Sequence, residues 1–378
     1  MSLDSIENAI EDIHDGKMII VVDEEDRENE GDLTMAAERV TPESINFMAT
    51  HGRGLICMPM TPERLDRLEI PLMVSRNESM YETAFCVSIE GRRNVSTGIS
   101  AADRATTILT AIDPRTRPED LIRPGHVFPL RARPGGVLER AGQTEAAVDL
   151  ARIAGLDPAG VICEIMNEDG TMARLPDLQR FAARHGIKIV SVVDLMKFRL
   201  RTERFVKRIQ EIPFECEQGR FQLVLYENEL DGNRHVVLTK GRVNTDEPVL
   251  VRVHSALLLG DVFSGLKHDS GRELRKALEL IQAEGRGVLV YLRYTDKEDR
   301  LLREITGEIQ YPANFRDYGV GAQILADLGL RNIRVLTNHP KKIVGLEGFN
   351  LNVVEQLSIP VRRAGDGQKE RRGVASGK

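Results

Sequence analysis

The chain of 378 residues contains no tryptophan, and its aromatic residues together make up only 4% of the sequence. Proteins that bind single-stranded nucleic acids commonly stack the bases on aromatic rings, so this composition argues against that class. The formal net charge is −6, and no broad basic stripe precedes the last residues of the chain. The sequence therefore predicts no nucleic-acid partner.

Cysteines are also few, and the thiols lie far apart without a C-x-x-C pair. Each thiol lies in or near an apolar stretch, as the buried thiols of a reduced protein do. They are Cys57, Cys86, Cys163 and Cys216. The stretch MSLDSIENAIEDIHDG at the start is acidic and amphipathic, unlike a signal peptide. No apolar run approaches the ~18 residues that a membrane span needs, so we expect a cytoplasmic protein with no membrane partner.

Strand-like and helix-like patterns alternate along most of the chain. Hydrophobic residues make up 41% and charged residues 29%, which is ordinary for a globular protein. The alternation predicts an α/β fold of the α+β type, in which helices cover a sheet, followed by a second α/β domain. A charged segment at 199–212 is typical of a connection, and Asp231-Gly232 marks a hairpin turn beyond it. The expected parts are domains at residues 1–200 and 201–361 and a disordered basic tail at 362–378.

Several helix starts carry capping residues. Thr41 precedes Pro42, and Ser100 lies three residues before Asp103, so each is a candidate N-cap. Asp4 with Glu7 fits the same pattern before the first helix.

The stretch VVDEEDRENEGD, residues 21–32, concentrates acidic side chains around a single arginine. It directly follows the apolar run 18–22, which predicts a buried strand. Four roles are open to this charge: a solvated turn, a site for a hydrated divalent cation, a general base among crowded carboxylates, and a helix cap. Arg27 within the run favours a binding role, because a guanidinium can hold a sugar hydroxyl, a phosphate or the carboxylates themselves.

The stretch RAGQTE, residues 140–145, offers what an anion would need at a predicted helix start. Arg140 supplies a positive charge, Gly142 flexibility and Thr144 a hydroxyl group. Backbone N–H groups and the helix dipole at such a start favour negative charge. An ordinary capped helix is the alternative interpretation.

Two isolated residues are further candidates. His126 lies in RPGHVFPLRARPGG, where proline and glycine predict mostly loop and short strand. Its imidazole could bind a ligand or move protons, or it could simply pack against its neighbours. Glu164 lies within the predicted strand GVICEIM, where a carboxylate is costly unless it is paired. It is therefore either a site residue or one end of a buried ion pair.

These stretches together resemble a known enzyme family. The segments DEEDRENEGDLTMAAE, HGRGLICMPM, STGISAADRATTI, RPGHVFPLRARPGGVLERAGQTEAAVDLARIAGL and PAGVICEIMNEDGTMARLPDL follow, in the same order, the pattern of 3,4-dihydroxy-2-butanone 4-phosphate synthase. The resemblance covers residues 1 to about 199. It implies conversion of ribulose 5-phosphate to 3,4-dihydroxy-2-butanone 4-phosphate and formate. It also implies a requirement for Mg²⁺ or Mn²⁺ and a homodimer with sites near the subunit interface.

The same resemblance assigns roles to particular residues. It places Glu28 on the metal and the segment 140–144 around the phosphate of the substrate. The residues it implies for substrate binding are Arg27, Glu28, Asp32, Arg140, Ala141, Gly142, Gln143, Thr144 and Glu164. The residues it implies for the chemistry are Glu28, Asp32, His126 and Glu164.

One position departs from the family pattern. The family commonly has histidine where this chain has Gln143, and that histidine is the second protein ligand of the metal. A glutamine carbonyl oxygen can bind Mg²⁺, but it has no titratable imidazole. The expected metal site therefore depends on Glu28, with Gln143 as the second candidate ligand.

Residues 213–361 resemble GTP cyclohydrolase II through EPVLVRVHSALLLGDVFSGLKHDSG, GVLVYLR and RDYGVGAQILADLGLRNIRVLTNHPKKIVGLEGFNL. That family binds zinc through three cysteines, and the matching positions here are Leu257, His268 and Ser270. Zinc prefers thiolate or imidazole ligands, and one histidine cannot replace three thiolates. The family's Q-E-G-R motif is replaced by Tyr294-Thr295-Asp296-Lys297. We therefore expect no zinc and no cyclohydrolase activity, and a domain kept for dimerisation, stability or regulation.

The sequence leaves three functions open. The leading one is a synthase with an inactive second domain. A protein with both activities is the enzymatic alternative, and a catalytically silent sensor of sugar phosphates or nucleotides is the alternative from another class. Lys341 and Lys342 in TNHPKK are the residues that would keep a nucleotide contact in the second domain.

Overall fold

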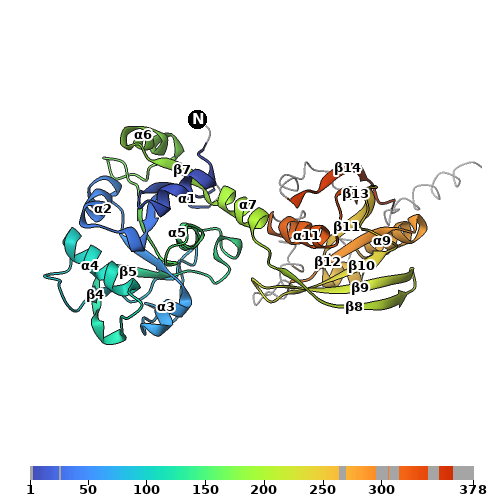
Figure 1. The fold of residues 1–378 in the computed structure, drawn as a ribbon, viewed down its shortest axis with the longest axis horizontal. Coiled ribbons are helices and arrows are strands. Elements are labelled where there is room, and N and C mark those ends of the chain that lie inside the picture. Colours follow the sequence, from blue (N-terminus) through green and yellow to red (C-terminus); the bar gives the residue numbers. More distant parts are fainter. Residues whose placement is uncertain are drawn as a thin grey trace, which may run out of the picture. The chain divides into compact units, whose positions relative to one another are not determined.

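The computed structural model describes residues 3–24, 27–263, 270–294, 305, 315–338 and 349–360. The chain divides into two compact units, and the division falls between Thr202 and Glu203. Each unit is built on a seven-stranded sheet with helices on its faces (Figure 1). The predicted α/β class with two domains is confirmed by this architecture. The predicted tail at 362–378 lies outside the described residues.

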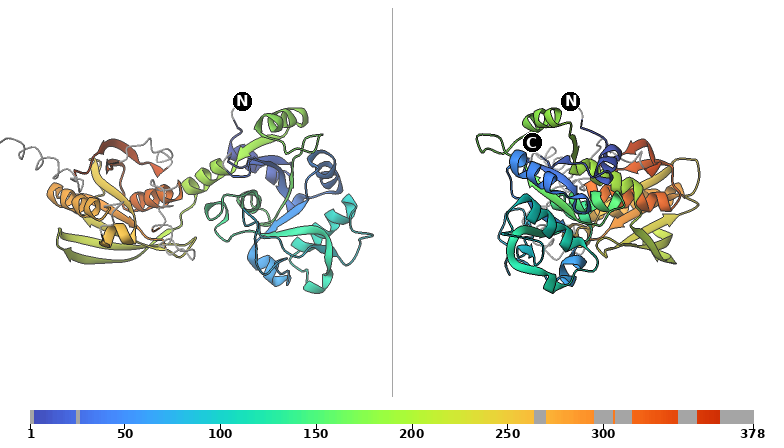
Figure 2. Two further views of the ribbon diagram at one scale, coloured as in Figure 1. Left: turned by 180° about the vertical axis from the view of Figure 1, so that it is seen from behind. Right: turned by 60° about the vertical axis from the view of Figure 1, so that its left-hand side comes forward.

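Helices and strands are interspersed along the first unit (Figure 2). Its α-helices are α1 (Ile6–His14), α2 (Pro42–Phe47), α3 (Pro62–Arg67), α4 (Ala101–Ile112), α5 (Gln143–Ile153), α6 (Leu175–His185) and α7 (Val192–Thr202). Its strands are β1 (Ile19–Val22), β2 (Gly31–Ala36), β3 (Cys57–Met60), β4 (Ile89–Gly91), β5 (Leu121–Arg131), β6 (Gly160–Glu164) and β7 (Lys188–Ser191). Short helical turns are η1 (Ala37–Arg39), η2 (Met48–Gly52), η3 (Pro118–Asp120) and η4 (Gly136–Leu138). The strands lie in the order β4-β5-β3-β6-β2-β1-β7.

Helices cover both faces of this sheet because the strands bury apolar side chains on both sides. Leu33 of β2 belongs to a cluster that includes Ile45 of α2, Ile108 of α4 and Leu178 of α6. The opposite face holds a second cluster, in which Val21 and Ala36 join α1, α5 and α7. Asp32 alternates with Leu33 along β2 and therefore belongs to the α5 face, where the candidate residues gather.

The capping residues predict some helix starts correctly and one wrongly. Thr41 caps α2 with a reciprocal bond to Ser44, and Ser100 caps α4, as predicted. The first helix is capped by Ser5 instead of Asp4. The Asp4 carboxylate instead accepts a hydrogen bond of 2.9 Å from the backbone N–H of Ile189. The side chain that the local pattern assigns to the helix cap is therefore used in a tertiary contact.

Strand β5 contradicts the predicted loop around His126. It runs from Leu121 to Arg131 and pairs with both β3 and β4, but its register with β4 shifts between Ile89 and Glu90. Gly125 lies at this irregularity, and a Cβ atom there would clash with the backbone of Ile89. Glycine and proline are tolerated where the pairing of a strand with its neighbour is interrupted. Their presence here therefore predicts a loop, although the segment is a long strand.

The second unit combines an antiparallel half with a parallel half. Its strands are β8 (Val206–Cys216), β9 (Gly219–Asn228), β10 (Arg234–Lys240), β11 (Val249–Ser255), β12 (Gly287–Leu292), β13 (Asn332–Leu336) and β14 (Asn352–Leu357). Its described helices include α8 (Leu258–Phe263), α9 (Ser270–Glu284) and α11 (Phe315–Asp327). The sheet order is β14-β13-β11-β12-β10-β9-β8. The β9–β10 hairpin turns at Asp231-Gly232, as predicted.

The segment 199–212 is not the connection that its charge predicts. Helix α7 continues to Thr202, and β8 begins at Val206 as an edge strand beside β9. Charged side chains are common on edge strands, because they discourage pairing with other chains. The composition of an edge strand thus resembles that of a linker. Among the described helices, none is both long and apolar enough to cross a membrane.

Candidate active site

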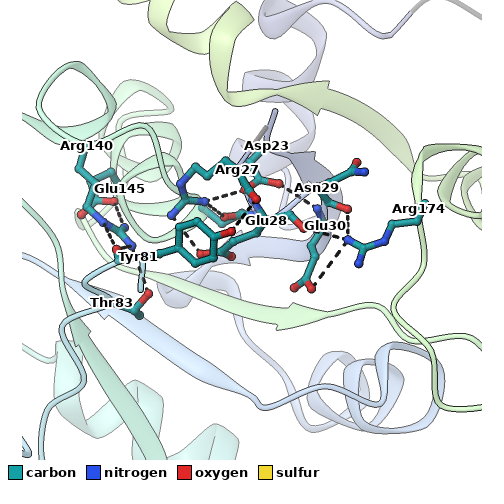
Figure 3. Close-up of polar contacts among 11 residues, drawn as sticks. Asp23, Arg27, Glu28, Asn29, Glu30, Tyr81, Thr83, Arg140, Glu145 and Arg174 are labelled. Carbon is teal, nitrogen blue, oxygen red and sulfur yellow. Dashed lines mark hydrogen bonds and ion pairs between the residues drawn. The ribbon is translucent and has the colours of Figure 1, made fainter. Parts of the chain in front are cut away.

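The acidic segment forms the connection between β1 and β2, and Asp23 organises it (Figure 3). The Asp23 carboxylate is fully buried and accepts hydrogen bonds from the backbone N–H groups of Glu28 and Glu30, at 3.1 and 2.9 Å. It also accepts a hydrogen bond of 2.7 Å from Nη1 of Arg27. The described residues of this connection are therefore held by specific hydrogen bonds, which argues against the simple solvated turn among the four alternatives.

Arg27 lies at the centre of a group of oxygen atoms. Besides Asp23, its guanidinium contacts Oε1 of Glu28 at 3.1 Å. It also donates a hydrogen bond of 3.1 Å to Oε1 of Gln143 at the start of α5. Its charge also lies over the ring of Tyr81, 5.4 Å from the ring centroid, and the Tyr81 hydroxyl donates to the Arg27 carbonyl at 2.7 Å. The side chain retains 18% of its exposure, so the cation is held in place but can still be reached.

Asp32 and Glu164 are brought together by strand register. Antiparallel pairing of β2 with β6 places them directly opposite each other. Glu164 accepts a hydrogen bond of 2.8 Å from the backbone N–H of Leu55, and no cation pairs with it among the described residues. The structure therefore does not bear out the buried-ion-pair alternative. Glu164 ends β6 and does not lie in mid-strand, because the following Ile165 leaves the ladder.

The carboxyl groups around this pair have pKa values above their ordinary range. Burial, and then the charges of Glu164 and Glu28, raise the pKa of Asp32 well above its usual value. Burial likewise raises the pKa of Glu164, and burial together with Glu28 raises that of Glu30. Crowded, buried carboxyl groups with raised pKa values favour a bound cation or a role in proton transfer.

The donor set fits a hard divalent cation such as Mg²⁺. Glu28 and Gln143 point their Oε1 atoms at the same guanidinium, so both oxygens converge on one place. No three His, Cys, Asp or Glu side chains of the described ranges form a complete metal site. Mg²⁺ usually keeps several waters and binds one or two protein groups, so two protein oxygen donors fit its usual coordination. The buried Nε2 of Gln143 has no partner within the described chain, and the amide oxygen faces Arg27 because the amide nitrogen would be repelled there.

The segment 140–144 forms a second cationic place beside the first. Arg140 donates from Nη1 to Oε2 of Glu145 at 2.6 Å and from Nη2 to the carbonyl of Tyr81 at 2.9 Å (Figure 3). Gly142 is the N-cap of α5 and provides no side-chain cap, so the first N–H groups of the helix keep their capacity for an acceptor. A Cβ atom on Gly142 would clash with Nη1 of Arg140, so a side chain there would displace the guanidinium from its present position. Ala141 is half-buried and Thr144 is buried beside it.

His126 lies on β5 on the same face of the sheet as Glu164. Cys57, Phe128 and Ile162 lie in one row across β5, β3 and β6 and share a cluster below α5. His126 and Glu164 each lie two residues beyond this row, at the same end, so they share its face. One strand separates them, which corresponds to roughly 10 Å between their backbones. The structure therefore places every predicted site residue at one rim of the sheet.

Several residues of the site carry no signal in their own sequence pattern. Tyr81 contacts both Arg27 and Arg140, and Glu145 binds the Arg140 guanidinium. Arg174, which precedes α6, donates to the carbonyls of Glu28 and Asn29 and so closes the far side of the loop. Of these supporting residues, Asp23 alone could have been identified from the sequence, because it is the first carboxylate after the predicted buried strand.

Comparison with known proteins agrees with this geometry. The sequence profile described as 3,4-dihydroxy-2-butanone 4-phosphate synthase matches residues 7–198, just over half of the chain. The chain belongs to the 3,4-dihydroxy-2-butanone 4-phosphate synthase family. A second profile, GTP cyclohydrolase II, matches residues 207–358. The chain is therefore an enzyme of riboflavin biosynthesis whose first unit is a synthase of this family, as the sequence predicts.

Relatives and solved structures cover both units of this synthase. Riboflavin biosynthesis protein RibBA of Aquifex aeolicus is 53% identical over 375 residues, 94% of this chain and 92% of the relative. RibBA of Bacillus mycoides is 49% identical over 369 residues, 94% and 93% of the two chains. The structure of RibBX, a two-domain synthase from A. baumannii, has a TM-score of 0.80 and 40% identity, covering 95% of this chain and all (100%) of that one. A synthase solved with two magnesium ions matches 53% of this chain and 98% of its own, with a TM-score of 0.51 and 41% identity.

The second unit places the predicted zinc positions in different surroundings. Leu257 is a buried apolar side chain, and the Ser270 hydroxyl donates to Asp261 at 2.6 Å. Asp261 also accepts from His254 at 2.9 Å and from the Tyr291 hydroxyl at 2.7 Å. Of the other predicted positions, His268, Thr295, Asp296, Lys297, Lys341 and Lys342 lie outside the described residues.

Proposed function

We propose that the first unit is a metal-dependent lyase that converts ribulose 5-phosphate to 3,4-dihydroxy-2-butanone 4-phosphate and formate in the cytoplasm. The observation that supports this most is the convergence of Glu28 and Gln143 on Arg27, beside two opposed carboxyl groups with raised pKa values. A substrate with several neighbouring oxygens needs such a mixture of cation, acceptor and proton donor.

Metal binding would use Glu28 and the amide oxygen of Gln143, with waters and substrate oxygens completing the coordination. A divalent cation, when bound, supplies positive charge that stabilises the negative charge developing on neighbouring substrate oxygens. Arg27 holds substrate oxygens beside it through charge-assisted hydrogen bonds. We propose Mg²⁺ or Mn²⁺, because both protein donors are oxygens, and the preference between the two ions is tested by adding each one to metal-free protein.

Proton transfer would be carried by Asp32, Glu164 and His126. Carboxyl groups whose pKa values are raised by burial bind a proton more readily than ordinary carboxylates and can return it, and carbon-bond rearrangement next to a carbonyl requires both steps. His126 lies on the same rim and adds an imidazole whose ring nitrogens can accept or donate a proton. These three groups surround the place where the substrate carbon atoms would lie.

The phosphate end of the substrate would lie at the start of α5. Arg140 provides charge there, and the uncapped N–H groups after Gly142 provide donors for phosphate oxygens. The hydroxyl of Thr144 lies in the same first turn. Glu145 and Tyr81 hold Arg140 in position, so the cation is oriented before the substrate arrives.

Formate release is the direct test of this function. Purified chain with ribulose 5-phosphate and Mg²⁺ should release one formate for each 3,4-dihydroxy-2-butanone 4-phosphate formed. A chain that binds ribulose 5-phosphate without formate release would instead be the silent sensor. Light scattering of the same sample tests the homodimer, which we propose from the resemblance to the family.

We further propose that the second unit binds no zinc and has no cyclohydrolase activity. Leu257 offers no ligand atom, and the Ser270 hydroxyl is already engaged with Asp261. Zinc analysis together with a GTP turnover assay separates this from the bifunctional alternative. A role in assembly or stability is tested by a chain that ends after residue 202: unchanged turnover and oligomeric state would exclude that role.

A further inference from the structure

His126 has a buried carboxylate as a partner. Its Nδ1 lies 2.6 Å from Oε2 of Glu90, a residue of β4 whose side chain is only 11% exposed. The contact lies at the irregularity between β4 and β5. Ile89 pairs with Val127, but the register shifts at the next residue, so that Glu90 pairs with Ile122. The Glu90 side chain therefore meets His126 where the ladder is interrupted, beside Gly125.

The second oxygen of Glu90 also has a hydrogen-bond donor. Oε1 accepts a hydrogen bond of 3.1 Å from the hydroxyl of Thr107 on α4. The Thr107 hydroxyl oxygen itself accepts a hydrogen bond of 3.0 Å from the backbone N–H of Gly91. The hydroxyl hydrogen is therefore directed at Glu90. An ionised carboxylate can only accept, so the hydrogen between Glu90 and His126 belongs to Nδ1. The neutral imidazole then carries a free lone pair on Nε2.

The loop before α4 closes tightly over this pair. Gly98 has φ +92°, and a Cβ atom there would clash with the Glu90 carboxylate and approach Nδ1 of His126 to 2.5 Å. Asp103 holds the loop by accepting from the backbone N–H groups of Ser96 and Gly98, each at 3.0 Å. The carboxylate is therefore enclosed by backbone on one side and bonded through both oxygens, while the imidazole keeps 45% of its exposure.

We propose that Glu90 is a positioning residue that fixes His126 as the tautomer with hydrogen on Nδ1, so that Nε2 is ready to take a proton from the substrate. The proposal rests on the proposed function, because it assigns the direction of a proton transfer in that reaction. The proton would pass from a substrate carbon or hydroxyl group to Nε2, giving an imidazolium whose charge the Glu90 carboxylate offsets. Returning the proton to a later intermediate restores the starting tautomer.

The test is Glu90→Gln, which keeps the shape of the side chain. Thr107 still donates to the position of Oε1, so the amide oxygen is held there and the amide nitrogen faces Nδ1. That nitrogen is a donor, and it should drive the hydrogen of the imidazole to Nε2. We expect kcat for formate release to fall about 10²-fold or more, with KM changed by no more than about twofold. Glu63→Gln, an exposed carboxylate on α3, is the matched control and should retain wild-type kcat.

Nitrogen NMR of protein with ¹⁵N-labelled histidine reads the tautomer independently of turnover. The His126 signal is assigned by its loss in His126→Asn. Wild type should show hydrogen on Nδ1 and Glu90→Gln should show it on Nε2. Thr107→Val should shift kcat in the same direction by less, with Thr106→Val as its control.

The outcomes separate the two proposals. A wild-type chain that releases no formate contradicts the proposed function, whatever the tautomer is. An active wild type whose Glu90→Gln variant keeps both kcat and the Nδ1–H signal contradicts the positioning role. A Glu90→Gln variant that is less active only because of a raised KM, with the tautomer unchanged, also contradicts it.

Discussion

Asp32 on β2 and Glu164 on β6 lie directly opposite each other in the antiparallel ladder, both on the α5 face of the sheet. Cross-strand neighbours of like charge destabilise a sheet, and here both carboxyl groups are also largely removed from water. A fold that retains such a pair has accepted a cost in stability at the place where the chemistry occurs. This relationship leads to a prediction that needs no assay of activity.

Asp32→Asn should make the metal-free protein more stable at neutral pH. The pKa of Asp32 is raised in the folded state by burial and then by Glu164, so ionising it costs the folded state more than the unfolded one. Wild-type stability should therefore fall as pH rises through the range between the ordinary carboxyl pKa and the raised one. The gain in stability of the variant over wild type should be largest above that pH range, and it should vanish below the ordinary carboxyl pKa.

Urea unfolding at several pH values in the presence of a chelator measures this difference. Asp15→Asn, a carboxylate with 55% exposure, serves as the control and should give a pH profile parallel to that of wild type. A variant less stable than wild type at pH 8 would show that Asp32 is ionised and well solvated, against the present account.

Glu28→Gln should abolish turnover while leaving the fold intact. The substitution removes the one ionised group among the two proposed metal donors, and we expect a loss of at least about 10²-fold in kcat/KM at 1 mM Mg²⁺. Its Oε1 can still accept from Arg27, so the thermal transition should move little. Isothermal titration with Mg²⁺ distinguishes the cause, because the variant should lose the binding heat that wild type gives. Chelator-treated wild type that works without added metal would contradict the role of the ion.

Gln143→His should strengthen metal binding or leave activity near normal. The family commonly has a histidine ligand at this position, so we expect a Kd for the divalent ion that is equal to or lower than that of wild type. The exchange also removes the acceptor that holds Nη1 of Arg27, so KM for ribulose 5-phosphate reports whether Arg27 needs Gln143. A collapse of kcat would mean that the site is built around glutamine.

The parts of the fold that depend on a few neighbouring residues could be predicted from the sequence. Thr41 and Ser100 cap their helices, and Asp231-Gly232 makes its hairpin, because caps and turns are decided locally. Strands β5 and β8 were missed because their proline, glycine and charge are explained only by neighbours in the sheet.

The site shows the same division between local and distant information. Arg27 and Glu28 stand out in the sequence because their charge is concentrated after a buried strand. Tyr81 and Glu90 could not be found in this way, since each acts on a partner tens of residues away that only the folded sheet brings near. Resemblance to the family supplied the remaining candidates, and the structure gathered them at one rim.

Arg199→Leu should destabilise the first unit by about 3–5 kcal/mol. Arg199 and Asp149 form a buried ion pair at 2.8 Å with 5% exposure on each side, which ties α7 to α5. Removing the cation leaves a buried carboxylate with only the longer and more exposed ion pair to Arg152, at 3.5 Å. A buried charge that loses its close partner is strongly destabilising. The double variant Asp149→Leu with Arg199→Leu removes both charges and should recover part of the loss in urea unfolding. A double variant less stable than Arg199→Leu alone would contradict this explanation.

Asp261→Asn should selectively destabilise the second unit. Burial alone would raise the pKa of Asp261, but hydrogen bonds from His254, Ser270 and the backbone N–H of Leu257 overcome it and lower the pKa to about 2. Because this value lies below that of an unfolded carboxyl group, the stabilisation is complete above the ordinary carboxyl pKa and is lost as pH falls toward 2. At pH 7 we expect a loss on the order of 2 kcal/mol, since an amide cannot accept from all of these donors. Hydrogen exchange should show faster exchange in β11 and β12 of the variant, and unchanged protection in α5 of the first unit. Equal loosening of both units, or an unchanged β11, would mean that these bonds do not hold the second core together.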